Sequence, residues 1–206
     1  TKTQSDARYA QESYVDTEVA AMLPKAGGAL TGAVTTNSTI DGRDVAADGV
    51  LAITTGTRNT AVGYGSLDAT TTGDKNTSIG GSALTNNTTG ENNTGLGFSA
   101  LQLNTTGTRN IAVGYDSLRS NTTGANNTSL GTSSLFTNTT GQKNTALGQG
   151  ALYSSTTASD NTAIGNDALF ANTTGTNNVA TGMLALTANT TGSNNTAVGK
   201  SALTAN

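Results

Sequence analysis

Few side chains capable of catalysis occur in this sequence, and those present are scattered. There is no histidine and no cysteine, which excludes Ser-His-Asp and Cys-His nucleophile systems and Cys/His zinc sites. Between residues 54 and 206 the six acidic side chains form neither a glycosidase carboxylate pair nor a row of calcium ligands: Asp68, Asp74, Glu91, Asp116, Asp160 and Asp167. We therefore expect no catalytic residue, no metal site, no cofactor and no enzymatic activity.

The aromatic side chains of the same region are placed more regularly, in two positions of a 17-residue repeat. One position holds Tyr64, Phe98 and Tyr115, and the other holds Phe136, Tyr153 and Phe170 in three consecutive copies. If the copies stack as rungs about 4.8 Å apart, the second set should form a ladder of rings. Such a ladder stabilises the fold or a seam between chains. Alternatively, both sets provide a strip on which sugar rings of a bacterial surface polysaccharide stack.

An asparagine recurs at the same spacing and predicts a structural ladder. Identical amides one rung apart can hydrogen-bond to each other and to turn backbone. Most copies have alanine two places on, so no N-glycosylation signal is preserved along the column. We therefore favour a ladder over a ligand or glycan at each asparagine: Asn59, Asn76, Asn93, Asn110, Asn127, Asn144, Asn161, Asn178 and Asn195.

The elements that position these side chains follow from the repeat itself. From residue 54 the chain repeats every 17 residues for nine copies without an insertion, with the consensus T-T-G-x-x-N-T-A-V-G-x-x-A-L-x-x-N. Seventeen residues suit two short strands and two turns, so the sequence predicts an all-β parallel β-solenoid of nine rungs. We name each column of equivalent residues after its first member.

The alternation within N-T-A-V-G predicts which side chains share a face. Thr60 and Val62 should lie on one face of the first strand and the small Ala61 on the other. A second strand is expected around the invariant Leu67. Gly56 and Gly63 are expected to supply the backbone conformations of the turns.

Composition agrees with a repetitive β structure. Only 33% of residues are hydrophobic, but charged residues are 11% and there is a single proline, whereas disordered chains are usually rich in both. Ten basic against thirteen acidic residues, without a basic run, argues against nucleic-acid binding. No stretch of 18 apolar residues occurs, so we expect no membrane partner.

The shortage of large apolar side chains predicts self-association. Each rung has about two large aliphatic residues, and a thin coil can leave one of the two columns outside. Parallel association of several chains would bury that column, and we expect a homotrimer. The expected trimer core is Val62, Ile79, Leu96, Val113, Leu130, Leu147, Ile164 and Val198.

Two segments precede the repeats at residues 54–206. Residues 1–23 contain Val15, Val19 and Met22 at helical spacing before Pro24, which predicts a short helix of coiled-coil type; a local helix without a partner is the alternative. Residues 24–53 are punctuated by glycines and predict a β connector. Because the sequence begins without methionine or a signal peptide, we interpret it as a piece of a longer protein.

The connector and the repeats carry a family resemblance. The segments L-P-K-A-G-G-A-L-T-G (residues 23–32) and I-D-G-R-D-V (40–45) resemble motifs of bacteriophage tail-fibre proteins. The T-G-x-x-N-T-A-V-G-Y repeat resembles the shafts of such fibres, which often precede a self-cleaving intramolecular chaperone. No chaperone sequence follows the ninth copy, so we expect it to be removed or to lie outside this piece. The repeat is more loosely similar to the head repeats of trimeric autotransporter adhesins, which are trimeric parallel β-rolls.

Three functions remain open on these grounds. The first is a structural tail-fibre shaft in the tail of a virion, with itself, other tail or baseplate proteins and host surface polysaccharide as partners. The second is the head of a bacterial surface adhesin. The third is an ice-binding solenoid, suggested by the Thr54, Thr55 and Thr60 columns. It ranks last because adjacent threonines should point in opposite directions and the Thr60 column is interrupted by Ile111 and Val179.

Overall fold

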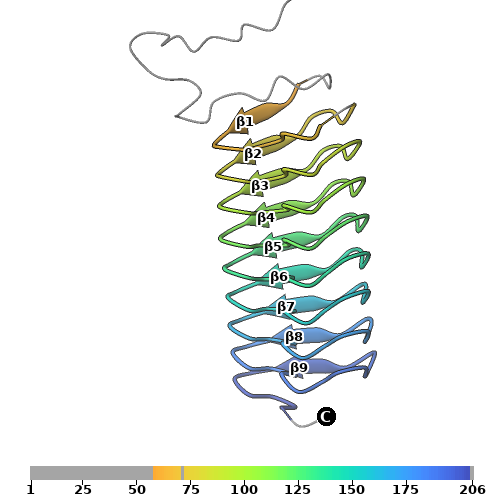
Figure 1. The fold of residues 1–206 in the computed structure, drawn as a ribbon. Coiled ribbons are helices and arrows are strands. Elements are labelled where there is room, and N and C mark those ends of the chain that lie inside the picture. The colour runs from red at the N-terminus through yellow and green to blue at the C-terminus, as the bar shows by residue number, and fades with distance from the viewer. Residues whose placement is uncertain (1–57, 71, 205–206) are drawn as a thin grey trace, which may run out of the picture. The chain divides into compact units, whose positions relative to one another are not determined.

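A computed structural model of the chain describes residues 58–70 and 72–204. These residues wind into a parallel β-solenoid in which each 17-residue repeat contributes one three-residue strand (Figure 1). The nine strands are β1 Thr60–Val62, β2 Thr77–Ile79, β3 Thr94–Leu96, β4 Ile111–Val113, β5 Thr128–Leu130, β6 Thr145–Leu147, β7 Thr162–Ile164, β8 Val179–Thr181 and β9 Thr196–Val198. The predicted all-β solenoid is confirmed. The described residues contain no helix. The helix predicted in residues 1–23 and the connector predicted in 24–53 lie outside them.

The strands form one sheet in sequence order, each pairing in parallel with the next. Residues 17 apart are paired, for example Thr60 with Thr77 and Val62 with Ile79. The offset is the same in all eight pairings. Because no copy inserts or deletes a residue, each column of the sequence is also a column in space.

The predicted alternation of faces in the strand is confirmed. The middle residue points into the coil and is alanine, serine or glycine in every copy, with Ser78 and Ala112 fully buried. The first and third residues point outward and are exposed or half-buried. Only small side chains fit at this middle position of the strand, because the returning half of the rung packs directly against them. Ser66 Oγ, for instance, reaches Ser78 Oγ across the coil at 2.6 Å.

The prediction of a second strand around Leu67 is wrong, because this part of the rung is a turn. The Leu67 column has a left-handed backbone, with φ between 49° and 55° in all nine copies. That conformation costs a side-chain-bearing residue roughly 1–2 kcal/mol. Complete burial of a leucine contributes about 1.5–3 kcal/mol, which offsets the strain. The leucines and the small side chains facing them form the core.

Two glycine columns differ in what requires glycine. In the Gly63 column φ lies between 121° and 139°, so the turn itself requires glycine, as expected, and from Gly63 to Gly182 a Cβ would also overlap the backbone of the next rung. In the described copies of the Gly56 column, from Gly73 to Gly192, the reason is space rather than φ. A Cβ on Gly107 would overlap the side-chain Oδ1 of Asn104 and lie 2.5 Å from the carbonyl oxygen of Gly124 in the next rung.

Candidate functional site

The outward face of the sheet carries a row of large aliphatic side chains that is interrupted once, at Thr181. Eight of the nine strands place valine, isoleucine or leucine at their third residue. Val62, Ile79, Leu96, Leu130 and Ile164 are between 39% and 43% exposed. The equally large leucines of the Leu67 column are fully buried from Leu67 to Leu186. Of the two aliphatic columns, the coil therefore encloses one and leaves the Val62 column on the surface.

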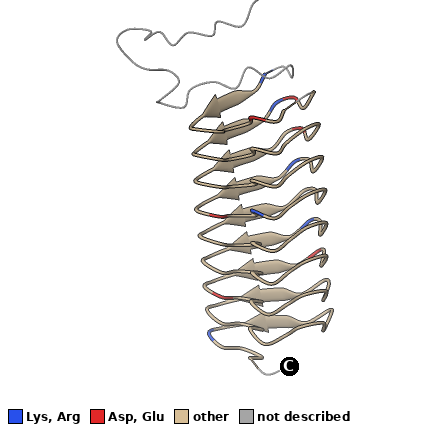
Figure 2. Ribbon diagram, viewed as in Figure 1, with Lys and Arg blue, Asp and Glu red and all other residues tan. Residues whose placement is uncertain are grey.

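No charged side chain lies on these strands. Figure 2 shows the charged residues in the loops that connect the strands. The Val62 column is flanked on its own face by the Thr60 column, which is threonine in seven rungs, Ile111 in β4 and Val179 in β8. The Thr60 and Val62 columns thus form a face with one hydroxyl row and one aliphatic row.

The aromatic residues Phe136, Tyr153 and Phe170 stack on the returning half of the rung. Their ring centroids are 5.2 Å and 5.0 Å apart, with planes within 10° of parallel. Each follows a buried leucine of the Leu67 column, and that segment packs across the coil from the strands. The stacked rings therefore lie on the side of the coil opposite the aliphatic row.

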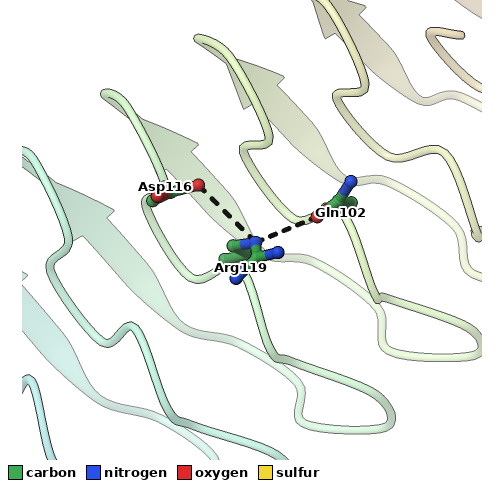
Figure 3. Close-up of polar contacts among 3 residues, drawn as sticks. All are labelled: Gln102, Asp116 and Arg119. Atoms are coloured by element: carbon green, nitrogen blue, oxygen red, sulfur yellow. Dashed lines mark hydrogen bonds and ion pairs between the residues drawn. The ribbon is translucent and has the colours of Figure 1, made fainter.

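The stack continues through a polar cluster around Arg119, in the preceding rung. Its guanidinium carbon lies 5.6 Å from the centre of the Phe136 ring, close enough for a cation–π interaction. Arg119 Nε donates to Gln102 Oε1 at 2.9 Å and lies 3.6 Å from Asp116 Oδ1 (Figure 3). The column thus runs through five rungs, from Gln102 to Phe170.

The stacking determines which parts of the three aromatic rings a sugar can contact. The rings of Phe136, Tyr153 and Phe170 contact one another through their faces, and Arg119 covers the outer face of Phe136. Apart from the second face of Phe170, what remains is the row of ring edges, which carry positive partial charge, and the guanidinium, since 39% of the Arg119 side chain is exposed. Such a row suits the hydroxyl or carboxylate oxygens of a sugar better than its apolar face.

The other aromatic column is more exposed. Phe98 and Tyr115 stack with centroids 5.7 Å apart and are 53% and 55% exposed, while Tyr64 is 79% exposed. Gly81 occupies the rung between Tyr64 and Phe98, and the Phe98 ring leans over it, 3.2 Å from where a Cβ would stand. The sequence-predicted aromatic residues therefore lie in two separate groups.

The Asn59 column forms a hydrogen-bonded ladder. The backbone N–H of each asparagine donates to Oδ1 of the asparagine one rung before, as Asn76 does to Asn59 at 2.8 Å. Nδ2 donates to a glycine carbonyl of the next rung, as Asn76 does to Gly90 at 2.8 Å. The interior members from Asn76 to Asn178 are completely buried, so these amides stabilise the fold and are not available to a ligand.

A second asparagine ladder was missed by the sequence analysis. It consists of the last residue of the consensus, and its signal was that recurrent final asparagine: Asn87, Asn104, Asn121, Asn138, Asn172 and Asn189. Here Nδ2 donates to Oδ1 of the preceding rung, as Asn121 does to Asn104 at 2.7 Å, and to the glycine three residues on. The Gly124 carbonyl accepts from both Asn110 and Asn121, so the glycine column joins the two ladders.

Two other kinds of site do not occur within residues 58–70 and 72–204. No group of three or more acidic, histidine or cysteine side chains comes together there in a way that would hold a metal ion. In the same part of the chain no helix has the length and apolar character needed to cross a membrane.

Two surfaces therefore remain as candidates. One is the aliphatic Val62 column on the sheet. The other lies on the opposite side of the coil and consists of Arg119, Phe136, Tyr153 and Phe170, which we call the Arg119–Phe170 column. Comparison of the chain with protein-family models, with curated proteins and with solved structures finds no match.

Proposed function

We propose that this chain is the shaft of a fibre in a bacteriophage or phage-like tail: a stiff homotrimeric rod that supports attachment to a bacterial surface. The observation that carries the proposal is the uninterrupted solenoid with an aliphatic row left on the outer face of its sheet. The tail-fibre motifs in residues 23–45 and in the repeat support the same assignment.

The aliphatic row supports association of copies of this chain. Monomeric soluble proteins seldom expose contiguous apolar patches larger than a few hundred Å². This row extends over nine rungs, or roughly 40 Å at about 4.8 Å per rung. A second copy aligned in parallel has the same period and the same row, so it matches this surface along its whole length. Three copies bury it around a common axis.

The hydrogen bonds support stiffness. Strand pairing and the two asparagine ladders run parallel to the stacking direction. Bending the coil would have to lengthen the bonds on one side of it. A rod that holds a receptor-binding tip away from a particle requires this property and little surface chemistry.

The place of the stacked aromatic column supports a surface polysaccharide as a further partner. Copies that meet through the aliphatic face would leave the Arg119–Phe170 column directed outward, since it lies on the opposite side of the coil. We expect the Arg119→Gln and Tyr153→Thr variants to lose retention of soluble bacterial polysaccharides in affinity electrophoresis. Equal retention of both variants and the unaltered protein would remove polysaccharide from the partners.

The second candidate is the head of a bacterial surface adhesin, which the same oligomer would serve. Antibodies against the solenoid distinguish the two in immuno-electron microscopy of the producing culture. Labelling of particle tails supports the fibre, with other tail or baseplate proteins as partners, and labelling confined to the cell envelope supports the adhesin. Ice binding is a weaker alternative, because the outward strand face has one threonine row rather than two.

A further inference from the structure

We propose that Thr181 sets the axial register between copies of the chain. The inference rests on the proposed association through the Val62 column and concerns how that interface avoids misalignment.

In β8 the two outward positions are reversed. The first residue is Val179, where its neighbours Thr162 and Thr196 are threonines. The third is Thr181, paired with Ile164 on one side and with the valine of β9 on the other. Thr181 is therefore a hydroxyl in a column that is otherwise aliphatic in every described strand.

No contact among the described residues accounts for this hydroxyl. The Thr181 side chain points away from the core and is half-buried, and its Oγ1 makes no hydrogen bond to any residue in 58–70 or 72–204. Valine has nearly the same shape and would continue the column. On the open face the hydroxyl can hydrogen-bond to water, so a protein partner for it would have to come from something that covers this face.

An interface between identical repeats can form in several axial registers, and a polar residue can favour one of them. The other eight members of the column are aliphatic and evenly spaced, so a copy shifted by one rung would make almost the same contacts. In the aligned arrangement the Thr181 hydroxyls of all copies meet and can hydrogen-bond to one another. After a shift each hydroxyl faces an aliphatic side chain and loses its partner. A single polar side chain sets register in coiled coils in the same way.

The absence of cysteine from the sequence allows a direct test by disulfide trapping on the full chain. Two forms, Leu130→Cys with a mass tag and Leu147→Cys without one, are co-expressed and mildly oxidised. Aligned copies form disulfides between identical positions. A shift of one rung brings position 130 of one copy level with position 147 of another, and the mixed disulfide forms. The ratio of mixed to identical disulfides, measured by mass spectrometry, reports the register.

We expect Thr181→Val to raise this ratio about tenfold, as the loss of a polar contact worth about one hydrogen bond predicts. The matched control is Thr162→Val, which makes the same substitution on the same face but outside the aliphatic column, and should leave the ratio unchanged. An unchanged ratio in Thr181→Val, with identical-position disulfides still forming, would overturn the register role and leave the association intact. A rise in both variants would also overturn it. Failure of folded protein to form any disulfide would instead contradict the association itself.

Discussion

Ser155 and Ala158 are complementary departures from the repeat, one at the end of the sixth copy and the other at the start of the seventh. In every other described copy the residue equivalent to Ala158 is glycine, and from Gly90 to Gly192 a Cβ there would overlap the asparagine three residues earlier, as on Gly141 with Asn138. Ser155 is shorter than asparagine and makes room for the buried methyl group of Ala158. Ser155 also interrupts the second asparagine ladder. Asn138 Oδ1 and Ser155 Oγ are both buried without a hydrogen-bond partner.

Restoring both residues together should therefore stabilise the coil. In Ser155→Asn/Ala158→Gly the new amide can donate to Asn138 Oδ1, as Asn138 itself donates to Asn121 at 2.9 Å. Pairing a buried acceptor should raise the free energy of unfolding by about 1–3 kcal/mol. Denaturant unfolding measures the change.

The two single variants show whether the residues are coupled. Ser155→Asn alone forces its amide against the Ala158 methyl group and should destabilise the coil. Ala158→Gly alone leaves the acceptor of Asn138 unpaired and creates a small cavity. If the effects of the single substitutions simply add up to that of the double variant, the two positions are independent and the proposed complementarity is wrong.

The asparagine ladder should depend on each of its interior members. In Asn110→Ala the buried backbone N–H of Asn127 loses its acceptor, Asn110 Oδ1, now at 2.9 Å. An unsatisfied buried donor costs about 1–3 kcal/mol, and we expect a loss of unfolding free energy in that range. The control is Asn86→Ala at an exposed position, which should change stability by less than about 0.5 kcal/mol. Equal effects in the two variants would mean that the ladder contributes nothing.

In the Leu67 column, where the backbone is left-handed, replacement of leucine by glycine should be no more destabilising than replacement by alanine. Leu118→Ala removes a fully buried side chain and should cost about 2–5 kcal/mol. Leu118→Gly removes even more, and glycine is normally worse than alanine. At φ of 50°, however, glycine avoids the strain of roughly 1–2 kcal/mol. Chemical denaturation should therefore show Leu118→Gly to be no less stable than Leu118→Ala. A clearly less stable glycine variant would show that the strain is absent.

The aromatic stack should contribute to stability in proportion to its contacts. Tyr153→Thr introduces a residue that the same column carries at Thr85 and Thr187, so the rung accommodates it. It removes two ring contacts, each worth about 0.5–1.5 kcal/mol. Tyr115→Thr removes one longer contact and should cost about half as much. Thermal unfolding that ranks Tyr115→Thr as the more damaging would contradict this assignment.

The sequence was most informative where a residue type repeats for one simple reason. Alternation of Thr60, Ala61 and Val62 was enough to predict which side chains enter the coil, since a strand alternates its side chains between two faces. It was misleading at Leu67, because a buried leucine normally indicates regular strand or helix. Here a left-handed turn places it inside.

The remaining features depend on contacts between rungs. The sequence shows that glycine recurs in the Gly56 column but not that a neighbouring amide occupies the space of its Cβ. It also places Arg119 and Phe136 in the same column, but the guanidinium over the ring and the bond to Gln102 depend on rotamers. The sequence predicted that the Val62 column lies outside the coil, but it did not predict the left-handed turn that encloses the Leu67 column.

The oligomeric state in solution tests the central claim most directly. The full chain and two double variants are measured by light scattering at matched concentration. Val113→Asp/Leu130→Asp places charges in the aliphatic row, where their burial without partners is costly. Thr106→Asp/Thr123→Asp places the same charges at exposed turn positions. We expect trimers for the unaltered chain and the turn variant, and monomers or unfolded chain for the Val113/Leu130 variant. A folded monomer for the unaltered chain, or full-strength trimers for the Val113/Leu130 variant, would contradict an interface built on the Val62 column.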